Sequence, residues 1–160
     1  MSKDTNINRK SDRELVVTRT FNGPARIVWK AWTTPDLFRS WWVPKSSGIS
    51  LLSCEMDIRT GGGYRLVFAH PSGEGTMAFF GTYLEVTPTS RMQWTNEEGD
   101  GEGALTTVTF EDRGDMTLVV LTDLYPTKEA LDEAMESGAI GGFGEQFEQL
   151  DALLPTLDAV

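Results

Sequence analysis

Residues 50–124 carry the sequence pattern that most restricts the fold. Segments rich in β-branched and aromatic residues alternate there with short turn sequences such as 60–63, 71–73 and 113–115. Strand-forming segments with so little chain between them are typical of an antiparallel meander. The pattern predicts six consecutive strands, near residues 50–59, 63–70, 76–87, 90–96, 104–112 and 115–124.

A further strand and two short helices are predicted ahead of this meander. Residues 14–21 are rich in strand formers, and Pro24 is well placed to begin the helix that follows. Apolar residues then recur at helical spacing up to Trp32, and Thr34 followed by Pro35 predicts a second helix start. Four of the five tryptophans lie on these two helices, within residues 29–42.

The last third of the chain is predicted to be helical. After a first helix that opens near residue 126, Ser137 and Gly138 predict a break. A longer helix follows, with an apolar stripe at spacings of three and four that includes Leu150 and Leu154. Such a stripe must be buried, and the sheet is the only surface large enough. We therefore predict an α+β fold, in which a curved antiparallel sheet of about seven strands wraps a long C-terminal helix.

Length and charge set the expected organisation and exclude some partners. Residues 1–12 are polar and predict a mobile N-terminal tail, residues 13–155 a single domain, and residues 156–160 a C-terminal tail. A net charge of −10 argues against nucleic acid and against anionic membranes as partners. No apolar run approaches the ~20 residues of a membrane span. Because residues 1–14 also lack an apolar signal region, we expect a cytoplasmic protein.

Metal and cofactor sites are not expected. His70 is the single histidine and Cys54 the single cysteine, which excludes paired imidazoles and cysteine clusters. His70 precedes a proline in a predicted hairpin and is expected in an exposed loop. Cys54 lies in the middle of a predicted strand and is expected to be an inert thiol. The sequence therefore predicts no metal, no cofactor and no assigned catalytic residue.

Other polar motifs favour structural roles. Asp57 and Arg59 share one face of a predicted strand just before the glycine turn, and a structural ion pair that braces this turn is expected rather than a catalytic role. The glycines at 61–63 precede a strand and lack a following Lys-Ser/Thr, so they do not predict a phosphate loop. Glu85 and Asp123 are candidates for a buried acid, although the sequence contains no carboxylate pair at a spacing suited to acid–base catalysis.

Four segments resemble a known family. They are FNGPARIVWKAWTTPDLFRSWWVP (21–44), MDIRTGGGYRL (56–66), GTYLEVTPTSRMQWT (81–95) and SGAIGGFGEQFEQLDALL (137–154). Their order is similar to that in the family homologous to the activator of heat shock protein 90 ATPase, within the START-like (SRPBCC) superfamily. The last segment has Phe143 where that family often has Trp. The resemblance spans residues 13–155 and implies a helix-grip fold.

The resemblance leaves several functions open, because this fold serves ligand carriers, cyclases, lipid-transfer proteins and chaperone partners alike. We expect a protein that binds a small hydrophobic or aromatic molecule between the sheet and the long helix. The alternatives are a cyclase- or dehydratase-type enzyme that uses the same cavity and a chaperone-associated interaction module. The family's eukaryotic chaperone activators carry a separate N-terminal domain, whereas only the polar segment 1–12 precedes the first predicted strand here. We therefore do not expect a chaperone partner. The sequence leaves open whether the protein forms a homodimer.

The expected cavity lining comes from aromatic and aliphatic residues on the inward faces of these elements. Adjacent tryptophans point about 100° apart on a helix, so one of Trp41 and Trp42 can lie in the core while the other lines a cavity mouth. Alternation on the strands places Phe79 and Phe80 on opposite faces without deciding which points inward. The residues predicted to line the cavity are Phe38, Trp41, Trp42, Tyr64, Leu66, Phe68, Trp94, Phe110, Val120, Phe143 and Phe147.

Overall fold

One antiparallel sheet of eight strands forms the body of the computed structural model, which describes residues 5–43, 45, 48–69, 75–97, 103–136 and 142–158. The strand order is β1-β2-β8-β7-β6-β5-β4-β3, so six consecutive strands form the predicted meander. The strands are β1 (Asn6–Arg9), β2 (Glu14–Phe21), β3 (Ser50–Met56), β4 (Gly63–Ala69), β5 (Thr76–Thr87), β6 (Arg91–Thr95), β7 (Leu105–Arg113) and β8 (Met116–Leu124).

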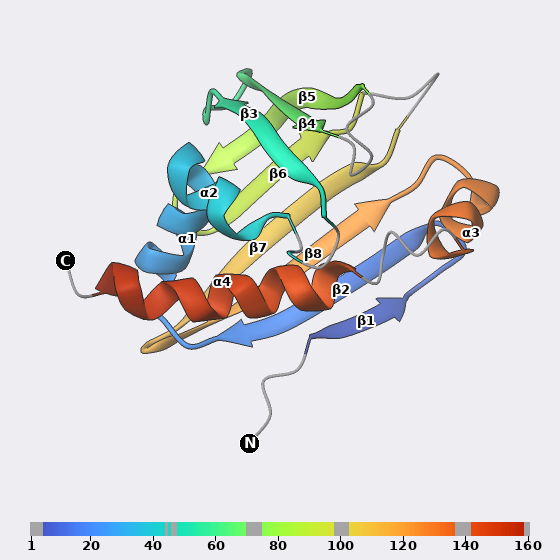
Figure 1. Cartoon of the computed structure of the whole chain (residues 1–160). Helices are drawn as coiled ribbons and strands as arrows, with labels where there is room; N and C mark the ends of the chain where they lie inside the picture. The colour runs from blue at the N-terminus through green and yellow to red at the C-terminus, as the bar shows by residue number, and fades with distance from the viewer. Residues whose placement is uncertain are drawn as a thin grey trace.

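Three of the four helices that the structure describes pack together on one face of this sheet. The helices are α1 (Ala25–Thr33), α2 (Pro35–Trp41), α3 (Lys128–Glu136) and α4 (Gly142–Asp158). Figure 1 shows α4 running across the sheet beside α1 and α2, with α3 apart at the other end. This is the helix-grip arrangement that the sequence predicts. Within the described residues, no helix is long and apolar enough to cross a membrane.

The two ends of the described chain differ from the prediction. Residues 1–12 were expected to form a mobile tail, which is wrong for Asn6–Arg9. These residues form β1, and each of the four pairs with a residue of β2. β1 is largely exposed, so backbone pairing rather than an apolar pattern holds it there. The expected C-terminal tail over residues 156–160 is wrong for 156–158, because α4 continues through Pro155 to Asp158.

The strand register decides which face of the sheet is buried. In β2, β7 and β8 alternate residues are buried, and the register places Leu121 of β8 beside Val17 and Val108. Val120 was expected on this inner face and is instead on the other one, where it pairs with Thr18 and Thr109. Both alternating sets in β8 contain large apolar residues, so sequence alternation alone does not identify the inner set.

The short helices begin close to where the prolines predict. Pro24 is the N-cap of α1 rather than its first residue, and Pro35 occupies the first turn of α2. On the C-terminal side, α3 ends at Glu136 and α4 begins at Gly142. The predicted break at Ser137 and Gly138 lies outside the described residues.

A buried ion pair fixes α4 against the sheet. Arg19 of β2 is buried, and its guanidinium lies 3.1 Å from the Asp151 carboxylate of α4. The other oxygen of Asp151 accepts a hydrogen bond from the backbone N–H of Asn22 at 3.2 Å. These two contacts of Asp151 anchor α4 to the end of β2.

The turn between β3 and β4 depends on a close backbone approach. Arg59 pairs with Asp57 at 2.9 Å, as predicted, and the backbone N–H of Gly62 donates to the Arg59 carbonyl at 2.8 Å. A Cβ atom on Gly62 would lie 2.1 Å from the backbone oxygen of Asp57. At Gly144 of α4, by contrast, a Cβ atom would meet nothing within 4 Å.

These two glycines give a matched test of the turn. Gly62→Ala should lower the free energy of unfolding by more than about 1 kcal/mol, because the backbone has to move to admit the methyl group. Gly144→Ala should be neutral or stabilise by up to about 1 kcal/mol, because alanine favours helix and finds free space. Urea unfolding measures both. Equal effects of the two substitutions would contradict the close approach at Gly62.

Candidate ligand-binding site

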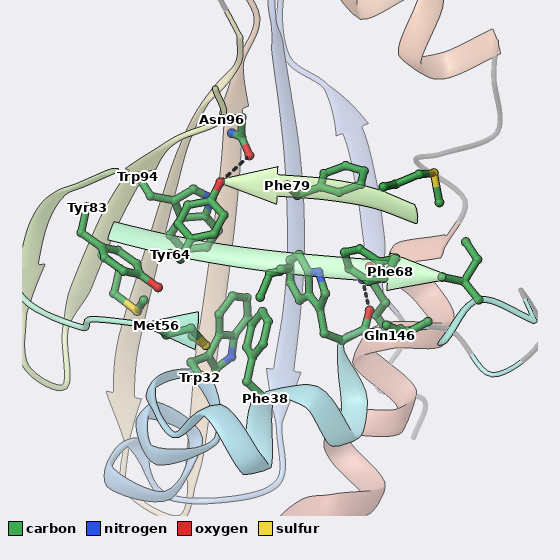
Figure 2. Close-up of a pocket in the computed structure, with 16 residues that line it drawn as sticks. Trp32, Phe38, Met56, Tyr64, Phe68, Phe79, Tyr83, Trp94, Asn96 and Gln146 are labelled. Carbon is green, nitrogen blue, oxygen red and sulfur yellow. Dashed lines mark hydrogen bonds between the residues drawn. The ribbon is translucent and has the colours of Figure 1, made fainter. Parts of the chain in front are cut away.

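A cavity of about 390 Å³ lies between the short helices and strands β3 to β6. We call it the apolar cavity (Figure 2). Its walls come from α1, α2, the segment that follows α2, and the inner faces of these four strands, with a single residue from α4. The lining residues are Trp32, Phe38, Trp42, Val43, Ile49, Met56, Tyr64, Leu66, Phe68, Met77, Phe79, Tyr83, Met92, Trp94, Asn96 and Gln146.

The cavity exists because α4 covers only one half of the sheet. α4 packs against β2, α1 and α2, and its Phe147 fills the space between Phe21, Trp32 and Trp41. The half formed by β3 to β6 is covered instead by α2 and the residues after it. Trp32 lies between the two halves, with its ring 6.1 Å from Phe147 and 6.4 Å from Trp94.

Two glutamines of α4 hold the segment that covers the cavity. Gln149 donates from its amide to the carbonyls of Trp41 and Val43 at 3.0 and 2.9 Å. Its side-chain oxygen accepts from the backbone N–H of Lys45 at 2.8 Å. Gln146 donates to the Trp42 carbonyl. Trp41 ends α2, and Trp42 and Val43 follow it, so these bonds satisfy carbonyl groups that the helix itself leaves unpaired.

The lining is apolar, with a small polar edge. Among the described residues, none of the sixteen that line the cavity carries a charged side chain, and burial raises the pKa of Tyr83, so its phenol stays neutral. The Tyr64 hydroxyl lies 2.8 Å from the Thr95 carbonyl and 3.2 Å from the Asn96 side-chain oxygen. Three methionines, Met56, Met77 and Met92, contribute flexible and polarizable walls.

A second, smaller pocket adjoins the apolar cavity. Its volume is about 250 Å³ and it contains one carboxyl group, so we call it the Asp123 pocket. Trp42, Trp94 and Asn96 line both spaces. The described residues that line it are Trp42, Trp94, Asn96, Ala104, Thr106, Leu121, Asp123, Tyr125 and Phe143.

Asp123 is the buried acid that the sequence suggested as one of two candidates. Its exposed fraction is 9%, whereas Glu85 is exposed and pairs with Arg91 at 2.9 Å. Thr106 donates its hydroxyl to Asp123 Oδ1 at 2.5 Å. Burial disfavours the charged carboxylate and raises the pKa of Asp123 to about 6, although the hydrogen bond from Thr106 acts in the opposite direction.

Six of the eleven predicted lining residues border the apolar cavity: Phe38, Trp42, Tyr64, Leu66, Phe68 and Trp94. The adjacent tryptophans separate as their 100° offset predicts. Trp41 is fully buried and donates its indole N–H to the Ala31 carbonyl at 3.1 Å, and Trp42 is half-buried beside the cavity. The sequence left open whether Phe79 or Phe80 faces the cavity. Phe79 does, and its ring lies 5.3 Å from that of Phe68.

The other five predicted residues lie elsewhere. Trp41, Phe110 and Phe147 are packed in the core and do not border the apolar cavity, because α4 and α1 fill that half of the molecule. Val120 is on the other face of the sheet, for the register reason given above. Phe143 lines the Asp123 pocket instead, with its ring 6.1 Å from Phe147.

Several lining residues were not predicted. The three methionines were missed because the prediction selected mainly aromatic residues. Strand alternation already placed Met77 on the same face as Phe79, and Met92 on the same face as Trp94. Trp32 was assigned only to the apolar face of its helix. Asn96 ends a predicted strand and Gln146 lies outside the predicted apolar stripe of the long helix, so neither was a candidate for the lining. Their places follow from tertiary packing, which local periodicity does not contain.

The remaining candidates include the cysteine, the histidine and groups of acidic residues. Among the described residues no group of three or more His, Cys, Asp or Glu side chains is placed to hold a metal ion. Cys54 is half-buried in β3, and burial raises the pKa of its thiol, which opposes thiolate formation. His70 lies outside the described residues.

Phenylalanines in the two environments should respond differently to truncation. Phe147→Ala should lower the free energy of unfolding by about 3–5 kcal/mol, because the ring is 0% exposed and packed on all sides. Phe79→Ala should cost less than about 2 kcal/mol, because the ring is 40% exposed and borders empty space. Urea denaturation compares the two. A full core-sized loss for Phe79→Ala would indicate that the cavity is filled.

Asp123 should make stability fall as pH rises. Its folded-state pKa of about 6 exceeds the ordinary value of 3.8, so folding favours the protonated acid. This contribution is complete below pH 3.8 and is lost as pH rises through 6. Between pH 4 and pH 7 the wild type should lose up to about 3 kcal/mol relative to Asp123→Asn. Denaturant unfolding of both proteins across this range measures the difference, and parallel pH profiles would refute it.

The chain is similar to one family model and to several solved structures. The family model for Activator of Hsp90 ATPase homolog 1-like protein matches residues 22–155. No curated protein matches the sequence. A solved structure from Rhodobacter sphaeroides is similar, with a TM-score of 0.86 and 25% identity over 96% of this chain and 99% of that one.

Two further solved structures extend the similarity. A protein from Nitrosomonas europaea has a TM-score of 0.84 and 25% identity, and the match covers 95% of this chain and all of that one. An AHSA1-like protein from Aeromonas hydrophila has a TM-score of 0.63 and 22% identity, over 83% of this chain and 92% of that one. This last similarity concerns the fold.

Proposed function

The chain belongs to the family of Activator of Hsp90 ATPase homolog 1-like proteins, within the START-like superfamily, and we propose that it binds a small, mainly apolar or aromatic molecule in the apolar cavity. Membership of this family points to ligand binding or to association with a chaperone. The observation that favours ligand binding is a preformed space of about 390 Å³ with an uncharged lining. Spaces of this size and character are typical of small-molecule sites.

The lining also suggests the character of the ligand. Trp42 and Trp94 offer flat aromatic surfaces, which suit an aromatic or polycyclic molecule. The methionines can adapt to ligands of more than one shape. At the edge, Tyr64 and Asn96 supply the few polar groups that would orient a bound molecule. A carrier or sensor of apolar molecules therefore fits the cavity better than an enzyme whose chemistry lies within it.

A neutral fluorescent probe tests the proposal. N-phenyl-1-naphthylamine should bind the native protein saturably at one site, with enhanced probe emission. Protein fluorescence should fall at the same time, because three tryptophans line the cavity. The titration is followed below the denaturant concentration at which the protein unfolds. Absence of saturable binding to the folded protein would refute the proposed function.

The chain offers a matched control for this titration. Phe79→Ala should weaken probe binding roughly fivefold, because the ring forms part of the wall. Phe80→Ala should leave affinity unchanged, because Phe80 is similarly exposed, at 39% against 40%, but lines a shallow hollow on the other face of β5. Equal weakening by both substitutions would place the probe outside the apolar cavity.

A further inference from the structure

The Asp123 pocket has the composition of a site for a positively charged group. We propose that it receives the protonated amine of an amphipathic ligand whose apolar part occupies the apolar cavity. The inference rests on the proposed function and narrows it, from apolar molecules in general to hydrophobic amines. It is carried by three features of the described residues: aromatic walls, a carboxylate with a free oxygen, and direct continuity with the apolar cavity.

The walls of the Asp123 pocket are mostly aromatic. Trp42, Trp94, Tyr125 and Phe143 come from four different parts of the chain and border the same space. The faces of such rings attract cations, tryptophan most strongly, and several rings around one ammonium group form a recognised cage. An ordinary apolar ligand would not require a carboxyl group among these rings.

The carboxyl group is held with one oxygen available. Asn96 donates from Nδ2 to the Ala104 carbonyl at 2.8 Å and to Thr106 Oγ1 at 3.0 Å. Thr106 therefore directs its own proton to Asp123 Oδ1. Within the described part of the chain, Oδ2 of Asp123 has no hydrogen-bond donor. An ammonium N–H could supply one, and the ion pair would replace the solvation that burial removes.

No described lysine, arginine or histidine lines this pocket, so the carboxylate has no cation of its own there. The groups that face it are Thr106 and Ala104 of the β7 region, Asn96 and Trp94 of the β6 region, Trp42 after α2, and Phe143 of α4. Tyr125 is the other titratable residue in the lining, and burial and the Asp123 charge raise its pKa to about 12. Among the described residues that line this pocket, only Asp123 changes charge between pH 5 and pH 8.

Continuity sets the shape of the ligand. Trp42, Trp94 and Asn96 border both spaces, so a molecule can extend past them with its ring system in the larger space and its amine in the smaller. A net charge of −10 further raises the local concentration of cations and lowers that of anions. The predicted class is therefore a monoamine attached to an aromatic or aliphatic body.

Three isosteric probes test the inference by calorimetric titration of the full chain at pH 7.5. At this pH 2-(2-naphthyl)ethylamine is a cation and 2-(2-naphthyl)ethanol is neutral. The third probe, 2-naphthylacetic acid, is present as its carboxylate anion. The amine should bind at least tenfold more tightly than the alcohol, and the carboxylate most weakly. In Asp123→Asn the amine and the alcohol should bind alike, whereas Glu85→Gln, which removes an exposed acid outside both pockets, should keep the preference for the amine.

The wild-type protein supplies an independent check if the Asn variant is unstable. The amine preference should shrink at least fivefold from pH 7.5 to pH 5, because Asp123 becomes protonated while the amine stays charged. Equal binding of amine and alcohol at both pH values would overturn this inference and leave the apolar proposal standing. Failure of all three probes and of N-phenyl-1-naphthylamine to bind would overturn both.

Discussion

The position of Trp32 determines which part of this fold is solid and which part is hollow. Its ring is fully buried and lies within 6.4 Å of five other aromatic rings, those of Trp41, Trp42, Trp94, Phe110 and Phe147. On one side, α1 and α4 fill the space above β2, β7 and β8. On the other side, α2 and the residues after it cover β3 to β6, but their side chains do not fill the space above these strands. The apolar cavity is thus a consequence of where the helices end.

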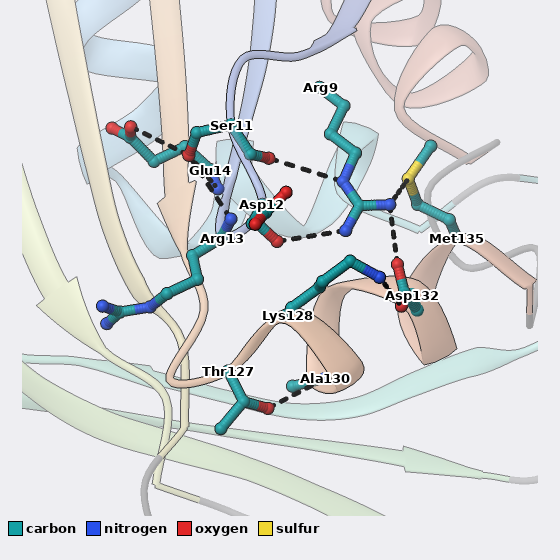
Figure 3. Close-up of polar contacts among 10 residues, drawn as sticks. All are labelled: Arg9, Ser11, Asp12, Arg13, Glu14, Thr127, Lys128, Ala130, Asp132 and Met135. Atoms are coloured by element: carbon teal, nitrogen blue, oxygen red, sulfur yellow. Dashed lines mark hydrogen bonds and ion pairs between the residues drawn. The ribbon is translucent and has the colours of Figure 1, made fainter.

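Much of the fold could be predicted because its signals are local. Prolines at the helix starts, turn residues between strands and apolar spacing in α4 are all visible in the sequence. β1 was not predicted because the interactions that hold it are not local. Its backbone pairs with β2, and Arg9 forms an ion pair at 2.7 Å with Asp132 of α3, which lies 123 residues further along the chain (Figure 3). One apolar residue, Ile7, in a polar segment gives no pattern to detect.

The site was predicted less completely, for two physical reasons. Strand β8 is apolar on both faces, so only its register with β2 and β7 shows that Leu121, not Val120, points inward. The long helix was expected to roof the cavity, yet Phe147 packs tightly against Phe21 at 5.3 Å and closes that half completely. Sequence periodicity identifies a buried face, but it does not distinguish a face that is packed from one that borders a space.

The structure retains features that a fold selected only for stability would lose. The cavity forgoes packing contacts. The Asp123 carboxyl sits among aromatic rings at a raised pKa, and the buried indole N–H of Trp32 has no hydrogen-bond partner among the described residues. Each lowers stability, and an unsatisfied buried donor alone costs about 1–3 kcal/mol. The cavity and the Asp123 carboxyl belong to the two joined pockets, and Trp32 borders the larger one. Against α4, Arg19 pairs with Asp151, although the buried Nε of Arg19 also has no hydrogen-bond partner among the described residues. The empty space and the buried acid beside it, next to a well-packed core, support the proposed binding site.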